Sequence, residues 1–271
     1  MLKDGKVTLK FLPRIKPGDD KFGTGYVERT KSIGRYFRAE LDTLKSEIEQ
    51  TTYFREKLIY NYLYKGPFVE WYMRIKTKLE KNYQVFHELV PQHGNILDIG
   101  CGYGFMAYML HFTASKRIIT GIDYDEEKIE TANHCFSKTD NVNFIHADAV
   151  SFNFKKYDAI IMADILHYLQ PDEQAMVIEK CIRQLNDGGI VIIRDGDRDA
   201  ERKHKKTELT EFFSTKIFKF NKTGDKGLSF FSGKLIRATA VQHKMECREI
   251  SDSKITSNTI YVLKKMQEDI A

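Results

Sequence analysis

From about residue 91 onward, the chain alternates short apolar runs with stretches of helical periodicity. The apolar runs read NILDIG, RIITGID, VNFIHAD, YDAIIMAD and GGIVIIRD. Between them, the pattern predicts helices over 104–114, 125–137 and 172–185. Strands that alternate with helices in this way are typical of βαβ units, which build a parallel sheet with helices on both faces.

The two ends of the chain show other patterns. Weak alternation over 5–16 predicts a short strand, and apolar positions at helical spacing predict helices over about 26–63 and 68–89. Near the C-terminus, a helix at 231–244 precedes two runs, ECREI and TIYVLKK, which predict a hairpin. We therefore expect an α/β fold. It is a Rossmann-like, doubly wound, mostly parallel sheet of about seven strands, with an antiparallel C-terminal hairpin and a helical N-terminal cap.

The positive charge is concentrated in the first part of the chain. The 271 residues carry a formal net charge of +5, and residues 1–38 hold ten Lys/Arg against four Asp/Glu, which leaves about −1 for the rest. We expect a basic N-terminal arm at 1–38, a helical cap or lid at 39–90 and a main domain at 91–271. The arm is either a solvated segment or a contact for anionic lipid head groups or an acidic neighbouring module. Because the main domain is not basic, we expect no nucleic acid as substrate.

Composition and cysteine spacing exclude several classes of protein. No apolar run reaches the ~18 residues of a membrane-spanning helix, and the N-terminus lacks the apolar core of a secretory signal. The four cysteines lie 34 or more residues apart without a CxxC pair, which predicts reduced thiols in a cytoplasmic protein. The histidines show no metal-ligand spacing, so we expect no metal.

The strongest chemical signal is the segment Ile96–Gly104, which reads ILDIGCGYG. An apolar strand runs into three alternating glycines, which permit a tight turn and let a ligand lie against the main chain. Asp98 stands two residues before the first glycine. It would repel the pyrophosphate of a dinucleotide and favour a cationic ligand such as S-adenosylmethionine (SAM). Phe105 replaces the last glycine of a dinucleotide GxGxxG pattern, and the absence of a following Lys-Ser/Thr excludes a triphosphate P-loop.

Two further acids end the next two predicted strands. Asp123 follows the strand 118–122 and is placed to accept hydrogen bonds from ribose hydroxyls. Asp148 follows the strand 142–147, where its carboxylate would accept from an adenine amino group and Ala149 would offer a backbone N–H. Because the carboxyl ends of parallel strands share one edge of a sheet, the three acids predict one site. The alternative is that each acid only caps a helix.

These motifs resemble those of class I SAM-dependent methyltransferases. The resemblance covers roughly residues 90–200 and rests on LDIGCGYG, GIDYDEEKIETA, HADA, YDAIIMADILHYL and LNDGGIVIIRD. It implies SAM as cofactor and S-adenosylhomocysteine (SAH) as product, with the glycine turn at the methionine end and the residues after the fourth strand along the methyl-transfer cleft. The residues that it implies for the cofactor site are Asp98, Gly100, Cys101, Gly102, Tyr103, Gly104, Asp123, Tyr124, Asp148, Ala149, Asp164 and Ile165.

A second resemblance lies ahead of that core. The stretch GKVTLKFLPRI…ERTKSIGRYFRAEL is similar to the end of a lysophospholipid acyltransferase domain. Some bacterial proteins look like a transporter, an acyltransferase and a methyltransferase fused in that order, and this chain resembles the last module with the tail of the second. It lacks the acyltransferase His-x4-Asp motif, so we expect no acyl transfer from it. The resemblance implies lipid metabolism at the inner face of the membrane.

The candidates for acceptor chemistry follow the fourth and fifth strands. The methyl group of SAM is already electrophilic, so a base is needed only when the acceptor keeps its proton at neutral pH. His167 is the first candidate for that base, with packing against adenine or helix capping as its alternatives. Asp195 is the second candidate, together with Asp197. The candidate acceptor walls, for which core packing is the alternative, are Trp71, Tyr72 and Phe213.

The sequence therefore predicts a SAM-dependent methyltransferase that acts on a small-molecule or lipid-like acceptor. The methyl group would go to oxygen or to a ring carbon, for instance of an acyl-linked aromatic compound. Two alternatives stay open: an NAD(P)-dependent oxidoreductase, and a non-catalytic module that binds SAM or its product.

Overall fold

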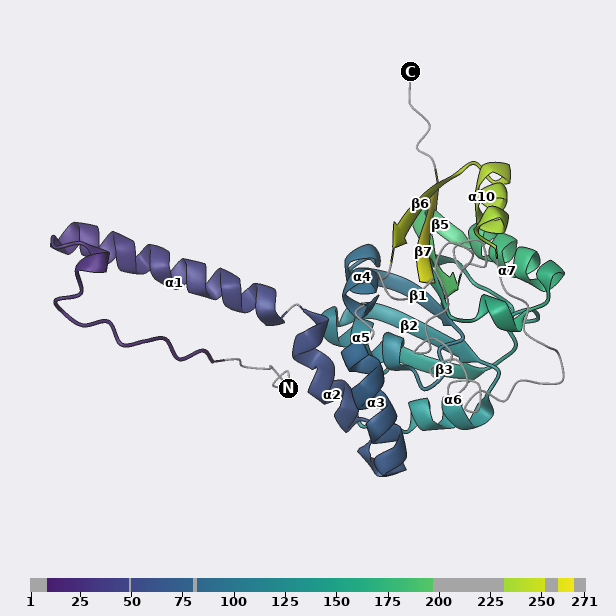
Figure 1. The fold of residues 1–271 in the computed structure, drawn as a ribbon, viewed down its shortest axis with the longest axis horizontal. Coiled ribbons are helices and arrows are strands. Elements are labelled where there is room, and N and C mark those ends of the chain that lie inside the picture. The colour runs from purple at the N-terminus through teal and green to yellow at the C-terminus, as the bar shows by residue number, and fades with distance from the viewer. Residues whose placement is uncertain (1–8, 49, 80–81, 197–231, 252–257, 266–271) are drawn as a thin grey trace, which may run out of the picture. The chain divides into compact units, whose positions relative to one another are not determined.

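The computed structural model describes residues 9–48, 50–79, 82–196, 232–251 and 258–265 (Figure 1). The chain divides into two compact units, Met1–Tyr53 and Phe54–Ala271. The predicted boundary between arm and cap, at residues 38 and 39, falls inside a helix of the first unit.

The first unit consists of one long helix and the segment that precedes it. A short 3-10 helix, η1 (Asp20–Phe22), comes before α1 (Tyr26–Ile48). Residues 9–16 form no regular structure, so the strand expected over 5–16 is absent from its described part. The helix expected over 26–63 ends at Ile48. The weak helix formers of TTYF form instead the 3-10 helix η2 (Thr51–Phe54).

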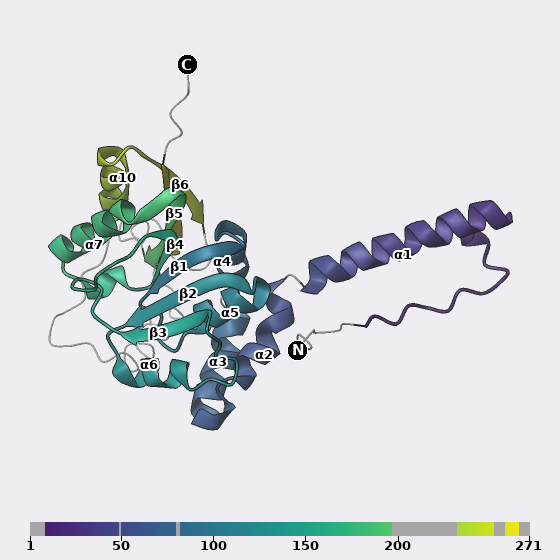
Figure 2. The same ribbon diagram turned by 180° about the vertical axis from the view of Figure 1, so that it is seen from behind.

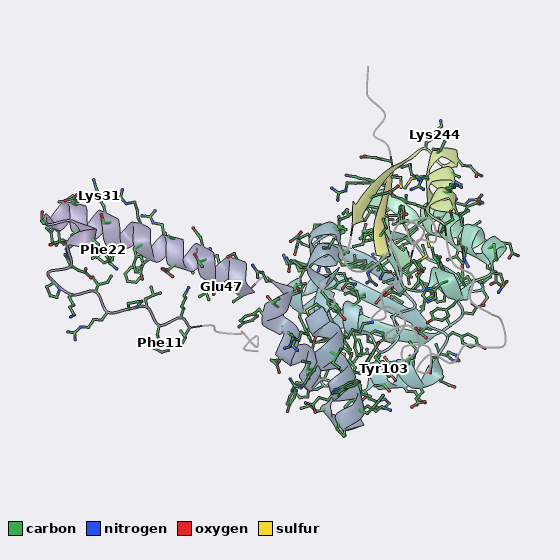
Figure 3. All side chains as sticks on the ribbon, viewed as in Figure 1. Phe11, Phe22, Lys31, Glu47, Tyr103 and Lys244 are labelled. Atoms are coloured by element: carbon green, nitrogen blue, oxygen red, sulfur yellow. The ribbon has the colours of Figure 1, made fainter. Side chains whose placement is uncertain are left out.

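Contacts between charged and aromatic side chains hold the preceding segment along α1. Lys10 forms ion pairs with Glu40 at 3.1 Å and with Glu47 at 3.9 Å. Phe22 is buried, and its ring meets that of Tyr36 edge-on at 5.5 Å. Figure 3 labels Glu47 and Phe22 on this unit. The segment is thereby fixed to one side of the helix.

The described part of the second unit alternates helices and strands. Its helical elements are α2 (Arg55–Tyr60), η3 (Leu63–Lys65), α3 (Pro67–Leu79), α4 (Asn82–Leu89), α5 (Phe105–Thr113), α6 (Glu126–Asn133), η4 (Leu166–Tyr168), α7 (Pro171–Arg183) and α10 (Gly233–Gln242). Its strands are β1 (His93–Ile99), β2 (Lys116–Asp123), β3 (Val142–His146), β4 (Tyr157–Ala163), β5 (Leu185–Gly196), β6 (Met245–Ser251) and β7 (Asn258–Lys265). The helix expected over 68–89 is thus two helices, α3 and α4.

The seven strands form one sheet in the order β3-β2-β1-β4-β5-β7-β6. Strands β1 to β5 run parallel to one another, whereas β7 runs antiparallel to both β5 and β6. The predicted fold class, including the C-terminal hairpin, is confirmed. The strand order proceeds outward in both directions from β1 and β4, and the carboxyl ends of strands at such a switch point form a crevice where ligands bind.

Helices cover both faces of the sheet (Figures 1 and 2), and alternate residues of the strands pack in two different cores. Ile96 and Ile161 pack in a core with side chains of α2 to α6. Leu97 and Ile160, their neighbours along the chain, pack in a second core with side chains of α7 and α10. The cap helices α2, α3 and α4 therefore share one layer with α5.

Hydrogen bonds from a buried arginine connect α4 and α5 to the sheet. Arg117 of β2 is fully buried, and its guanidinium donates to the carbonyls of Pro91 at 2.7 Å, Leu110 at 2.9 Å, His87 at 3.0 Å and Val90 at 2.7 Å. The last carbonyls of a helix have no partner within the helix and favour a cation. Burial lowers the pKa of Arg117 to about 10, so the side chain still carries its charge at neutral pH.

Over the parts of the chain that the structure describes, no helix combines the length and the apolar character needed to cross a membrane.

Candidate active site

The glycine turn after β1 has the backbone conformation that its sequence predicts. Gly100, Gly102 and Gly104 have φ angles of +73°, +53° and +77°, a region that favours glycine. The N–H groups of Gly100 and Cys101 donate to the carbonyl of Ile122 at 2.8 and 3.0 Å, which joins the turn to the end of β2.

Side chains pack tightly against two of these glycines. A Cβ atom on Gly100 would lie 3.0 Å from the Cδ1 atom of Ile165, and one on Gly104 would lie 2.5 Å from the ring of Phe144. Ile165, which sequence reasoning placed along the methyl-transfer cleft, therefore contacts the glycine turn directly. Larger residues at these two positions would displace the turn.

Asp98 lies within β1, one strand residue away from the turn. Its side chain is 2% exposed, and among the described residues its Oδ2 atom has no hydrogen-bond partner. Burial, and secondarily the charge of Asp123, raise the pKa of Asp98 to about 7, while the charge of Lys76 acts in the opposite direction. A buried carboxylate without a partner is unfavourable unless a donor or cation completes it. The ammonium group at the methionine end of SAM is such a partner, so the residues present fit that cofactor.

Asp123, at the end of β2, supports the glycine turn from the other side. Its Oδ2 atom accepts from the N–H of Gly102 at 2.7 Å, and its Oδ1 atom accepts from the N–H of Asp125 at 2.9 Å. Each carboxylate oxygen has two lone pairs, so Asp123 can accept further hydrogen bonds from ribose hydroxyls. The carboxylate predicted to bind ribose thus also holds the turn in shape.

The residues predicted near adenine lie along the same edge of the sheet. Asp148 is exposed after β3, and its Oδ1 atom accepts from the N–H of Val150 at 3.1 Å, whereas Ala149 is buried. Tyr124 is 74% exposed, and its carbonyl lies 2.9 Å from the Nε2 atom of His146.

Of the two remaining members of the glycine turn, Cys101 is buried and Tyr103 is half-buried. Burial raises the pKa of the Cys101 thiol well above its usual value, so it stays protonated. The ring of Tyr103 stacks on Phe105 at 5.6 Å, and its carbonyl accepts from the hydroxyl of Tyr62 at 2.7 Å. Burial raises the pKa of Tyr103 to about 12. Figure 3 labels Tyr103 in the second unit.

An ion pair joins the ends of β4 and β5. Asp164 has a φ angle of +57°, which is uncommon for a residue with a side chain, and its N–H donates to the carbonyl of Arg194 at 2.8 Å. The guanidinium of Arg194, with only 5% of its side chain exposed, forms an ion pair with the carboxylate of Asp164. This partner of Asp164 was not predicted from the sequence, although an arginine within the apolar run IVIIRD is a signal for it.

His167 and Asp195, two separate candidates in the sequence, form one hydrogen-bonded pair. The Nδ1 atom of His167 lies 2.8 Å from Oδ1 of Asp195, and the backbone N–H of His167 donates to Oδ2 at 3.3 Å. Asp195 is 2% exposed and also accepts from the N–H of Gly196 at 2.8 Å. Burial on its own lowers the pKa of His167, but the hydrogen bond and charge of Asp195, with the charge of Asp164, raise it above its usual value. This is the arrangement of a base with an orienting carboxylate.

The predicted acceptor walls have different environments. Tyr72 on α3 is partly buried, with its ring 6.1 Å from that of Phe105, whereas Trp71 is 52% exposed. Phe213 and Asp197 lie outside the described residues. Tyr72 therefore covers the start of α5.

Comparison with known proteins gives one family match and several partial relatives. Residues 96–189 match a family model described as a methyltransferase domain. The carboxy-S-adenosyl-L-methionine synthase of Campylobacter concisus (strain 13826) is 22% identical over 115 residues, which is 42% of this chain and 49% of that protein. The chain thus spans about half the length of the curated relatives that it matches.

Two solved structures share the fold. An O-methyltransferase family protein from Burkholderia thailandensis superposes with a TM-score of 0.55 at 15% identity, over 72% of this chain and 57% of that chain. Magnesium protoporphyrin IX methyltransferase from Synechocystis PCC 6803, solved with bound SAM, gives a TM-score of 0.53 at 14% identity, over 83% and 96% of the two chains. At these identities the likeness concerns the fold.

Proposed function

From the premise that this chain carries a class I SAM-dependent methyltransferase domain, we propose that it transfers the methyl group of SAM to a small-molecule or lipid-like acceptor. The family match over 96–189 bears out a methyltransferase domain there, and the shared fold of a methyltransferase solved with SAM supports SAM as the cofactor. The acceptor and the atom that is methylated are proposals.

The observation that carries the proposed activity is the buried carboxylate of Asp98 beside the glycine turn. With 2% of its side chain exposed and no hydrogen-bond partner for Oδ2 among the described residues, it favours a cationic ligand and disfavours a diphosphate. SAM carries an ammonium and a sulfonium, whereas a nicotinamide dinucleotide carries a pyrophosphate.

Calorimetry of the whole chain with SAM, SAH and NADH tests this proposal. SAM and SAH are expected to bind and NADH is not, and tighter binding of NADH would favour the oxidoreductase alternative. Mass spectrometry of cell metabolites after incubation with SAM should then show a product heavier by one methylene group. SAM binding without any methylated product would favour the non-catalytic alternative.

We propose that His167 acts as the base when the acceptor holds its proton. Bound SAM supplies the electrophilic methyl group. His167 takes the acceptor proton on Nε2, because Asp195 binds the ring at Nδ1 and stabilises the charge that the imidazole gains. A phenol, with a pKa of about 10, is an acceptor that needs this help at neutral pH. A hydroxyl or an activated ring carbon of an aromatic compound fits this chemistry.

We propose an acyl-linked aromatic or lipid-like acceptor because the first unit resembles the tail of an acyltransferase. The whole chain, incubated with SAM and cell extract, is expected to methylate compounds of the lipid-soluble fraction. Methylation confined to the water-soluble fraction would contradict a lipid-like acceptor and leave methyl transfer intact.

We propose that the first unit brings the enzyme to the cytoplasmic face of the membrane or to an acyltransferase, fused or neighbouring. On α1, Phe37 and Leu41 are 50% and 49% exposed and lie one turn apart. Lys31, Arg35 and Arg38, at four- and three-residue spacing, form a basic stripe on the same helix. An amphipathic helix with basic residues is typical of binding to anionic lipid.

Sedimentation of the full chain with vesicles tests this location. The protein is expected to bind vesicles that contain phosphatidylserine and to lose this binding in the variant Lys31→Glu/Arg35→Glu/Arg38→Glu. The matched control reverses the charge of three exposed lysines of the second unit, Lys155, Lys234 and Lys264. Equal loss in the control, or no binding by the unmodified chain, would contradict a membrane location.

A further inference from the structure

We infer that Lys76 on α3 binds the carboxylate of the methionine end of the cofactor, while Asp98 binds the ammonium of the same end. The inference rests on the proposed function, because it assumes that SAM or SAH binds. It assigns to Lys76, a residue of the cap, the carboxylate that both ligands carry beside their ammonium.

The first support is the position of Lys76 on α3, on the side of the helix that lies near the start of α5 and the glycine turn. Tyr72 lies one helical turn before Lys76, and the Nζ atom of Lys76 lies 5.8 Å from the centre of the Tyr72 ring. The Tyr72 ring in turn lies 6.1 Å from that of Phe105, the first residue of α5. Met73, on the adjoining side of the helix, is fully buried in the core and fixes the rotation of α3. Lys76 is therefore held on the side of the cap that covers the glycine turn.

The second support is electrostatic. The ammonium of Lys76 lowers the pKa of the Asp98 carboxyl, against the effect of burial, so its charge lies near enough to act on that carboxylate. The two ends of an amino acid zwitterion carry opposite charges a few ångströms apart. A buried carboxylate at Asp98 together with the partly buried residue Lys76 matches both charges and sets their order.

The other basic residues of α3 have different surroundings. Arg74 forms ion pairs with Glu70 at 2.9 Å and Glu56 at 3.3 Å, and Lys78 is exposed. Neither of these two charges is among the causes of the change in the pKa of Asp98. Among the basic residues of α3, Lys76 is thus the one that both lies near the Tyr72 ring and lowers the pKa of Asp98.

Lys128 on α6 is the competing cation. Its Nζ atom lies 3.8 Å from the Asp125 carboxylate and 5.9 Å from the centre of the Tyr103 ring. The N–H of Asp125 donates to Asp123, the carboxylate predicted to bind ribose, so Lys128 lies on the Asp123 side of the turn. It is the alternative that the experiment must separate from Lys76.

Calorimetry with SAM and decarboxylated SAM tests the inference without any need for turnover. The two ligands differ in the carboxylate alone, since both keep the ammonium and the sulfonium. The unmodified chain is expected to bind SAM about 10- to 100-fold more tightly, as for a charge-assisted hydrogen bond. In Lys76→Met this preference should disappear through weaker SAM binding, with decarboxylated SAM bound about as before. Lys76→Arg should retain most of the preference, and Lys78→Met all of it.

The outcomes separate this inference from the function on which it rests. A preference that persists in Lys76→Met, or one that disappears in Lys128→Met instead, overturns the role of Lys76 and leaves the cofactor assignment standing. If the unmodified chain binds neither SAM nor SAH, the proposed function fails first. Thermal unfolding of each variant shows whether the fold is kept, and the arginine variant provides the readout if Lys76→Met does not fold.

Discussion

Carboxylates on the two sides of the switch point differ in whether they have partners within the protein. On the cofactor side, Asp98 is buried and its Oδ2 atom has no partner among the described residues. On the acceptor side, Asp164 pairs with Arg194, and Asp195 binds His167. On the first side, Oδ2 of Asp98 has room for a partner that a ligand can supply, whereas on the second side both carboxylates are already paired within the protein.

This difference separates recognition from chemistry. A carboxylate that lacks a partner stabilises the ligand that supplies one, so it contributes to cofactor affinity. A histidine whose ring is already oriented and whose protonated form is stabilised contributes to proton transfer. Changes on the cofactor side should therefore alter binding, and changes on the acceptor side should alter turnover.

The largest effect is expected from His167→Ala, which removes the proposed base. Turnover of a phenolic acceptor should fall by about 100- to 10,000-fold, while SAH affinity measured by calorimetry changes less than about twofold. His146→Ala, at an exposed histidine on the same edge of the sheet, serves as control. If SAH affinity in His167→Ala fell by as large a factor as turnover, this histidine would instead pack against the cofactor.

The next largest effect concerns the stability of the fold that carries both the cofactor side and the acceptor side. Arg117→Met leaves four buried carbonyls of α4, α5 and their connections without their donor, and should lower the free energy of unfolding by about 3–5 kcal/mol. Urea denaturation followed by circular dichroism measures this. Arg183→Met is the control, because that side chain is 68% exposed. If the two variants unfold alike, Arg117 does not anchor these helices.

Asp98→Asn should weaken SAM binding by about 30- to 100-fold, since the neutral amide cannot replace a buried charge beside an ammonium. The same change should stabilise the ligand-free domain. The raised pKa of Asp98 means that the fold favours its protonated form, so this contribution is complete below pH ~4 and is lost as the pH rises toward 7. The stability advantage of the variant should therefore grow between pH 4 and 7. Asp187→Asn, at a fully exposed side chain, should change neither quantity.

The smallest effects are two pH dependences that separate the two sides. SAM affinity should rise with pH up to about 7, because Asp98 must lose its proton to pair with the ligand. Turnover should rise with pH through the raised pKa of His167, since the base acts in its neutral form. Asp195→Asn removes the carboxylate that raises this pKa, so it should move the turnover limb to lower pH and leave the binding limb in place. A shift of both limbs would show that the two sides are coupled.

The main features of the fold were predictable from the chain because each rests on local pattern. Asp98, Asp123 and Asp148 stand near the ends of three apolar runs, and parallel strands bring their carboxyl ends to one edge, so three residues far apart in sequence could be placed along that edge. The break after Ile48 and the absence of a strand over 9–16 depend on weak propensities, which the periodicity did not resolve.

The pairings within the site were not predictable. The hydrogen bond between His167 and Asp195 depends on side-chain rotamers at the ends of two strands, and nothing in the spacing of 28 residues indicates it. Lys76 and Lys78 look alike in sequence, and only the packing of α3 distinguishes them. The contribution of Phe213 stays a prediction, because that residue lies outside the described part of the chain.

The two N–H groups bound by Asp123 bear on how the cofactor enters and leaves. Because the turn is already fixed by the protein's own carboxylate, the ligand does not have to order a loop when it binds, and the entropic cost of association is small. In the proposed methyl transfer, such preorganisation would let the product exchange for fresh cofactor between cycles without reordering of the turn.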